Sequence, residues 1–142
     1  LRAIRVMRDA GIPVGVLCAP MIPMINDMEL EAMLAEAKAA GALSASYVML
    51  RLPLEVAPLF EEWLQVHYPQ RAERVLSLIR QSRGGELYDS RFGARMRGEG
   101  VFADLLAQRF KAGLKRYGLD RREGYNLDCS AFCPPGGQMS LL

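Results

Sequence analysis

The stretch AGIPVGVLCAPMIPMIND, residues 10–27, decides the fold, because an Ala-Gly step, a Val-rich run and a proline-broken segment follow one another directly. Residues 12–18 are apolar at both odd and even positions, which predicts a parallel strand buried on both faces. Residues 19–27 contain Pro20 and Pro23 and end in Asn26-Asp27, a pair suited to capping a helix. The stretch therefore predicts a strand, a loop and the start of a helix.

The same order occurs twice along the first third of the chain. A helical pattern over residues 1–10 ends at Gly11, and a second one over residues 28–40 ends at Gly41. The segment AGALSASYVMLRLP, residues 40–53, then predicts a second buried strand over residues 45–52. Two parallel strands joined by a helix form a right-handed βαβ unit.

Two buried parallel strands need neighbours on both edges. We therefore expect most of the sheet to lie outside this sequence, which begins with Leu1 in the middle of a helical pattern. The expected fold class is α/β, with residues 1–54 as the last strands and helices of a larger fold.

After Pro53 the pattern is helical only. Apolar spacing predicts a helix over residues 56–67, a second helix from Pro69 onward and a third over residues 101–117 that ends at Gly118. Residues 82–100 are rich in glycine and arginine and predict a long loop. We expect residues 55–118 to be a helical C-terminal extension and residues 119–142 to be an extended tail.

Composition limits the classes of function. The chain has 142 residues, 51% hydrophobic and 24% charged, which is typical of a globular domain. Its net charge of +2 is too small to argue for nucleic acid or a membrane surface. Three cysteines cannot form an even disulfide framework, so we expect a reduced, cytoplasmic protein. The longest apolar stretch, residues 12–25, contains three prolines and is shorter than the roughly 20 residues that cross a bilayer.

The best candidate site lies at the carboxyl ends of the two predicted strands, where parallel sheets bind ligands. Arg51 could bind a carboxylate or phosphate bidentately, or it could pair with Glu55. Asn26 and Asp27 are more typical of helix caps than of ligand contacts. Met21 and Met24 suit an apolar ligand wall and ordinary packing equally well.

Other residues carry weaker signals. Cys129 and Cys133 have the spacing of two metal ligands, but Gly136 stands where a third cysteine would complete C-x3-C-x2-C. His67 is the only histidine, and its place at a helix end favours a structural role. The loop of residues 88–98 interleaves aromatic and basic side chains that could hold phosphates and stack bases, or could form a solvated connector or internal clamp: Tyr88, Arg91, Arg95 and Arg97.

Three stretches together resemble a known family. They are RLPLEV (residues 51–56), ERVLSLIR (residues 73–80) and GGELYDSRFGARMRG (residues 84–98), and the tail with PP at 134–135 and QMSL at 138–141 adds to them. The chain resembles the C-terminal half of bacterial radical S-adenosylmethionine proteins of the subgroup related to spore photoproduct lyase, often called DNA repair photolyase-like. The YDSRFG stretch, residues 88–93, is the most specific part.

The resemblance implies the fifth and sixth strands of a partial (β/α)6 barrel followed by helices. In such enzymes a [4Fe-4S] cluster on a C-x3-C-x2-C motif cleaves S-adenosylmethionine to a 5′-deoxyadenosyl radical that abstracts hydrogen. That motif is not in this sequence, so the implied partner is the N-terminal half of the same protein, without which this fragment would be inactive. The resemblance makes a DNA-repair-type lyase one candidate activity and suggests these cofactor-side residues: Pro20, Met21, Ile22, Pro23, Asn26 and Arg51.

Two alternatives stay open. A non-catalytic helical module could bind DNA or another polyanion through the loop residues Tyr88, Arg91, Arg95 and Arg97. A purely structural role is the other, and exposed strand edges could also pair copies of the chain into a homo-oligomer. Neither the pattern nor the resemblance identifies a substrate, and no membrane partner is expected.

Overall fold

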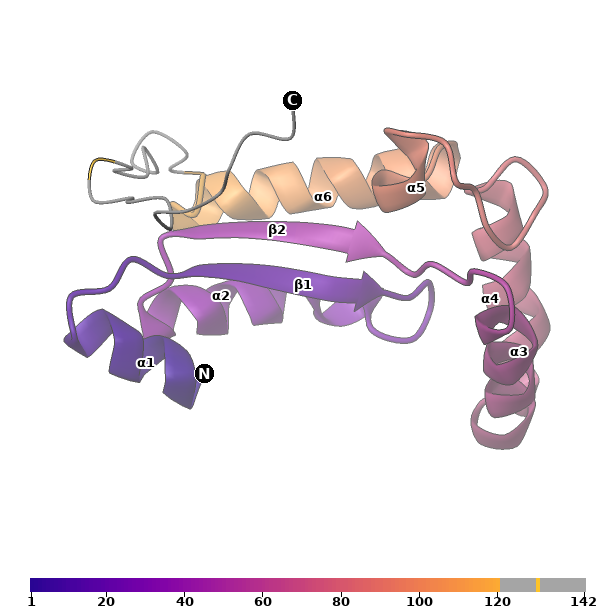
Figure 1. Ribbon diagram of the computed structural model, residues 1–142, viewed down its shortest axis with the longest axis horizontal. Helices are drawn as coiled ribbons and strands as arrows, with labels where there is room; N and C mark the ends of the chain where they lie inside the picture. Colours follow the sequence, from indigo (N-terminus) through magenta and orange to yellow (C-terminus); the bar gives the residue numbers. More distant parts are fainter. Residues whose placement is uncertain (121–129, 131–142) are drawn as a thin grey trace, which may run out of the picture.

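The computed structural model describes residues 1–120 and residue 130 (Figure 1). It is a mixed structure of helices around a two-stranded parallel sheet, which agrees with the predicted α/β class, while the larger barrel stays a prediction. The predicted tail falls outside the described residues except for 119, 120 and 130. The elements are α1 (Arg2–Asp9), β1 (Gly15–Met21), the short 3-10 helix η1 (Asp27–Glu29), α2 (Leu30–Ala40), β2 (Ser44–Met49), α3 (Val56–His67), α4 (Pro69–Gln81), α5 (Ala94–Arg97) and α6 (Val101–Tyr117).

Strand β1 begins and ends three residues later than the predicted strand over residues 12–18. It pairs with β2 from Gly15 opposite Ser44 to Cys18 opposite Tyr47, and the register then shifts before Met21. Pro20, which has no N–H for the ladder, falls within this shift. Pairing with β2 thus carries the strand through a proline that the sequence pattern assigned to a loop, and the predicted start of that loop at residue 19 was wrong.

The helix boundaries follow the glycine and proline positions. Gly11, Gly41 and Gly118 all have positive φ and end α1, α2 and α6, as predicted. Pro69 opens α4 immediately after α3, and α6 spans the predicted residues 101–117. The predicted loop of residues 82–100 contains the four-residue helix α5, a short turn that its Gly-rich sequence concealed.

The main core lies on one face of the sheet. Helices α2 and α6 both pack there, and the Phe110 ring of α6 lies 4.7 Å from the Tyr47 ring of β2. The core therefore joins α6 to the strands directly, although the sequence places α6 within the predicted extension. Its largest fully buried members include Met21, Leu30, Leu34, Met49, Leu106 and Leu119.

The opposite face of the sheet is open in the described part of the chain. Leu17 is 57% exposed, although its neighbour Cys18 on the covered face is buried. In the described residues the strands are thus buried on one face only, because α2 and α6 cover the same face, and burial of the second face stays a prediction for the larger fold. Figure 1 shows the two strands with α2 and α6 running along them.

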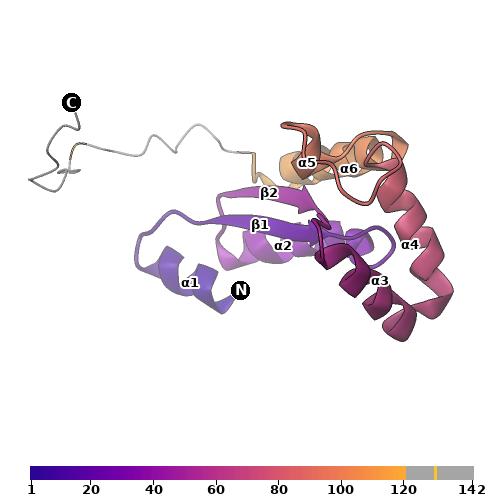
Figure 2. The ribbon, with the colours of Figure 1, turned by 45° about the vertical axis from the view of Figure 1, so that its right-hand side comes forward.

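A second core cluster lies beside the carboxyl ends of the strands, where α3 and α4 form a helical hairpin (Figure 2). Leu52 and Leu64 are fully buried in it, and Ile22 and Leu50 from the segments after the two strands pack against it. His67 lies at the end of α3 with its ring 5.2 Å from Trp63, in keeping with a structural role. No helix in the described residues has both the length and the apolar character to cross a membrane.

Candidate functional site

The segment after β1 is held in shape by two side chains at its end. Asn26 Oδ1 accepts a hydrogen bond from the Ile22 N–H at 2.7 Å, and its Nδ2 donates to the Pro20 carbonyl at 2.9 Å. Asp27 Oδ1 accepts from the Met24 N–H at 2.6 Å. Asn26 occupies the N-cap position of η1 as predicted, but neither side chain forms a capping hydrogen bond, so that part of the prediction was wrong. Each side chain instead accepts a hydrogen bond from a backbone N–H of the segment itself.

This fold of the segment limits which candidate side chains can meet a ligand. Met21 and Pro23 are buried, and Ile22 packs against the second core cluster. Pro20 is exposed, and Asn26 is occupied by the backbone bonds just described. A ligand at this edge would meet the Pro20 ring and the backbone of the segment.

Arg51 lies just beyond β2, where its guanidinium reaches the Arg-rich loop. Its Nη2 donates to Tyr88 Oη at 3.2 Å, and its Nη1 lies 3.9 Å from Met96 Sδ. The structure thus brings together two candidates that the sequence had assigned to separate sites. The alternative pairing of Arg51 with Glu55 is not formed. Arg51 Nε is buried and has no hydrogen-bond partner in the described structure.

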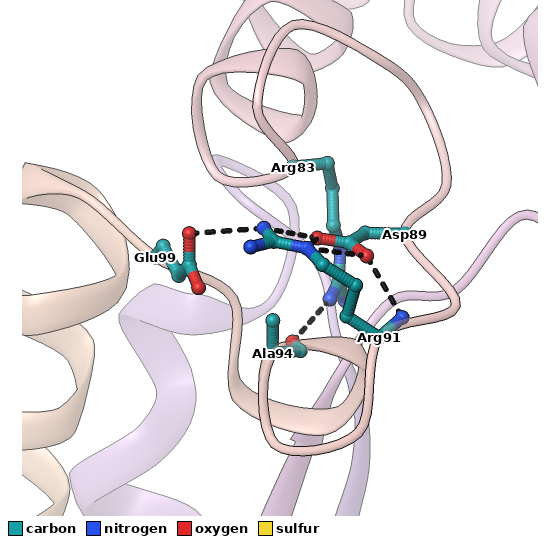
Figure 3. A network of polar contacts seen from close by, with 5 residues as sticks. All are labelled: Arg83, Asp89, Arg91, Ala94 and Glu99. Atoms are coloured by element: carbon teal, nitrogen blue, oxygen red, sulfur yellow. Dashed lines mark hydrogen bonds and ion pairs between the residues drawn. The ribbon is translucent and has the colours of Figure 1, made fainter.

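Arg83 is a functional candidate that the sequence analysis missed. It is only 3% exposed and donates from Nη2 to the Leu50 carbonyl at 2.9 Å and from Nη1 to the Ala94 carbonyl at 2.7 Å (Figure 3). Burial lowers the pKa of Arg83, the nearby Asp89 carboxylate opposes this, and the Arg51 cation adds to it. No local pattern separates this arginine from its exposed neighbours, because its partners lie 11 and 33 residues away.

The other basic residues of the loop are engaged within the protein. Arg91 Nη2 pairs with Asp89 Oδ2 at 2.7 Å and with Glu99 Oε2 at 3.1 Å (Figure 3). Hydrogen bonds from Arg91 lower the pKa of Asp89. Arg97 lies 4.0 Å from the centre of the Tyr47 ring. These contacts agree with the internal-clamp interpretation, and of the four loop candidates only Tyr88 reaches the strand-end site through Arg51.

A second ionic group ties α6 to η1 and to the first turn of α2. Arg109 bonds Glu31 through Nε at 3.0 Å and Nη2 at 2.8 Å, and Nη2 also donates to the Asp27 carbonyl at 2.9 Å. The bonds to Arg109 lower the pKa of Glu31 and raise that of Arg109. Sequence patterns did not reveal this link, since its partners are about 80 residues apart.

The described residues hold no group of three or more His, Cys, Asp or Glu side chains that could bind a metal ion. Cys18 is buried in the main core, and burial raises the pKa of its thiol. Cys129 and Cys133, the possible pair of metal ligands, lie outside the described residues.

Comparisons with known proteins add no assignment. The chain matches no protein-family model, no curated protein and no solved structure.

Proposed function

We propose that this chain is the C-terminal, cofactor- and substrate-facing part of a radical S-adenosylmethionine enzyme of the spore photoproduct lyase-related subgroup. The family resemblance of residues 51–56, 73–80 and 84–98 motivates this proposal. Its main structural support is the parallel β1–α2–β2 unit with helices on one face and an open, partly apolar second face.

That asymmetry suits one sector of a partial barrel. In such a barrel the helices form the outer layer, the inner faces of the strands look toward the ligand, and the strand ends carry the site residues. Leu17 would then belong to the inner face, and the segment after β1 and Arg51 would lie at the site. The helical hairpin of α3 and α4, packed beside the strand ends, would help to exclude water from it.

The described residues do not fit the iron–sulfur cluster of this family, because they provide no set of cysteine ligands. The cluster ligands are therefore assigned to the N-terminal half that we propose completes the protein. With its cluster partner, S-adenosylmethionine supplies a radical for hydrogen abstraction. This chain fits the cofactor only in part, through the Pro20 ring, the backbone held by Asn26 and the incompletely bonded Arg51.

The role of the chain is to form a rigid wall. The hydrogen bonds of Asn26 and Asp27 hold the segment after β1 in one shape before any ligand arrives. A wall that is already ordered loses little conformational entropy on binding, which favours affinity. Asn26 is thus a positioning residue and would act through the backbone.

The test uses the intact protein, reconstituted anaerobically with iron and sulfide and then reduced in the presence of S-adenosylmethionine. We expect release of 5′-deoxyadenosine. Asn26→Ala should weaken cofactor binding about tenfold, because loss of its two hydrogen bonds to the backbone costs about 1–2 kcal/mol. The exposed Met28→Ala should leave binding unchanged. A reconstituted protein that neither binds S-adenosylmethionine nor releases 5′-deoxyadenosine would refute the proposal.

One observation favours the second candidate, a module that binds DNA or another polyanion. Phe92 is 93% exposed, and the Arg95 guanidinium lies 5.4 Å from the centre of its ring. An exposed aromatic ring beside a half-buried basic side chain is an arrangement that can stack bases and hold phosphates. Binding to single-stranded DNA should then weaken steeply with salt and disappear when Arg91, Arg95 and Arg97 are all changed to Ala. Binding that is absent or independent of salt would exclude this candidate.

A further inference from the structure

Two neighbouring arginines at the carboxyl edge of the sheet differ from the other strongly bonded arginines of the chain. Arg91 and Arg109 each bond two acidic residues, and the exposed Arg8 and Arg80 each pair with one. Arg51 and Arg83 have no carboxylate within salt-bridge distance in the described structure. Their hydrogen-bond partners in the described structure are two carbonyl oxygens, a phenol and a thioether.

Burial makes this arrangement costly. A cation removed from water is destabilised unless an opposite charge or enough hydrogen-bond acceptors replace the water. Arg83 is almost fully buried, and the Nε atoms of both Arg51 and Arg83 are buried without a partner. The negative charge of Asp89 acts on Arg83, but the Asp89 carboxylate oxygens are bonded to Arg91. The edge of the sheet therefore has a net positive charge that the described residues do not balance.

Tyr88 adds a hydroxyl donor to the two guanidinium groups of Arg51 and Arg83. Its hydroxyl oxygen accepts a hydrogen bond from Arg51 Nη2, which leaves its own O–H proton free to donate to another acceptor. Arg83 bonds the Leu50 carbonyl just after β2 and the Ala94 carbonyl of α5. It therefore fixes the end of the strand and α5 relative to each other. Arg51 and Tyr88, which are only half-buried, are reachable from solvent.

We propose that Arg51 and Tyr88, backed by the buried charge of Arg83, bind a phosphate group of a ligand. Arg51 and Tyr88 donate to the phosphate oxygens, and Arg83 acts as a positioning residue that also contributes positive charge. A phosphate is favoured over a carboxylate because two guanidinium charges match a doubly charged group better than a single one. The phosphate could belong to a free ion, a nucleotide or a nucleic-acid backbone.

This inference goes beyond the proposed radical chemistry and does not rest on it. Phosphate binding can be measured without iron, sulfide, reductant or S-adenosylmethionine. The two proposals can therefore fail separately: release of 5′-deoxyadenosine without phosphate binding would overturn only the phosphate site.

The experiment titrates the intact protein with inorganic phosphate by calorimetry, with ionic strength held constant by chloride. Arg51→Gln should weaken binding at least about tenfold and Tyr88→Phe about three- to tenfold, in line with the loss of charged and neutral hydrogen bonds. Arg80→Gln is the matched control, because Arg80 is an exposed arginine paired with Glu61, and it should bind like the wild type. Circular dichroism checks that each variant is folded.

Further titrations separate the sources of the phosphate. A mononucleotide and a short oligonucleotide that bind more tightly than inorganic phosphate, and lose affinity in Arg51→Gln, would support the site and identify its ligand class. Acetate that binds as tightly as phosphate would overturn the choice of phosphate. Absence of phosphate binding in the wild type, or equal losses in Arg51→Gln and Arg80→Gln, would overturn the site. If Arg51→Gln fails to fold, Tyr88→Phe alone decides, since it removes one hydroxyl and keeps the ring.

Discussion

The arginines of this chain have different roles because their surroundings differ. Arg109 neutralises Glu31 and holds the Asp27 carbonyl, so its main role is to join two elements. Arg91 closes the Arg-rich loop on itself through Asp89 and Glu99. Arg51 and Arg83 have no such acidic partner in the described structure, and for this reason the proposed ligand site is assigned to them.

The pair of Arg109 and Glu31 predicts a dependence of stability on pH. Hydrogen bonds from Arg109 lower the pKa of Glu31 in the folded protein. A carboxyl group with a lowered folded pKa stabilises the protein above its unfolded pKa of about 4.3, and this contribution is lost as pH falls through the folded pKa. We therefore expect Glu31→Gln to flatten the loss of stability below about pH 4.3.

The measurement is the free energy of unfolding by urea between neutral and acidic pH. The effect should be modest and should shrink with added salt, because the Glu31 side chain is 39% exposed. Glu62→Gln, on the exposed part of α3, serves as the control. Identical pH profiles for wild type and Glu31→Gln would contradict the prediction.

At the scale of elements, the sequence predicted helices better than strands. Glycine and proline affect the backbone locally. Gly41 and Gly118 therefore predicted the ends of α2 and α6 correctly, and Pro69 predicted the start of α4. The end of β1 depends instead on pairing with β2, which carries the strand past Pro20. Burial also depends on which helices cover which face, and the apolar pattern along the strand could not reveal that α2 and α6 share one face.

The site was predictable to a similar degree. Arg51 was a candidate by position, since it follows a parallel strand, and Tyr88 was a candidate by composition. Their contact with each other and the burial of Arg83 were not predictable, because they depend on how the Gly-rich loop folds back over the strand end. The link between Arg109 and Glu31 was not predictable either, because the two residues are 78 positions apart along the chain.

Two glycines that end helices predict different costs of substitution. Gly11 and Gly41 both have positive φ, so alanine at either should cost about 1–2 kcal/mol of backbone strain. A Cβ at Gly41 would also collide with the Arg8 side chain, whereas a Cβ at Gly11 would meet nothing within 4 Å. We expect Gly41→Ala to be the more destabilising in thermal unfolding.

The double variant Arg8→Ala/Gly41→Ala tests the cause. Removal of the Arg8 side chain should recover the part of the loss that comes from the collision, so the two changes should not be additive. Equal costs for Gly11→Ala and Gly41→Ala would show that the approach of α1 to the end of α2 is not as close as described.

The packing of α2 on α6 predicts a second substitution effect. A Cβ at Gly113 of α6 would lie 2.5 Å from Leu34 Cδ1, and Leu34 is fully buried. Gly113→Ala should gain about 1 kcal/mol of helix propensity but lose about 1–3 kcal/mol to overpacking. We expect a net destabilisation in urea unfolding. In the background of Leu34→Ala the same change should become stabilising, and a loss of equal size there would contradict the contact.

At the scale of the whole molecule, the described residues form two hydrophobic clusters. One face of the sheet packs on helices, and its other face is open to solvent in the described structure. The main core is built by α2, α6 and one face of the strands, and the second by the hairpin of α3 and α4 beside the strand ends (Figure 2). The backbone N–H of Ala45 on β2 donates to the carbonyl of Leu119, and Ser44 and Asp120 form an antiparallel β-bridge through their backbones. The start of β2 thus gains a partner from the chain after α6.

The other face of the sheet gives the sharpest test of the proposed barrel. If this chain forms one sector of it, Leu17 faces the interior of the intact protein, although it is 57% exposed in the described structure. Leu17→Lys would then bury an unpaired charge and should cost more than about 4 kcal/mol, in the range of severe core substitutions. Leu105, which is 52% exposed on the outer helix α6, is the matched control. Leu105→Lys should change stability by no more than about 0.5 kcal/mol. Urea unfolding of the intact protein distinguishes the two, and equal small effects at both leucines would mean that this face of the sheet is not enclosed.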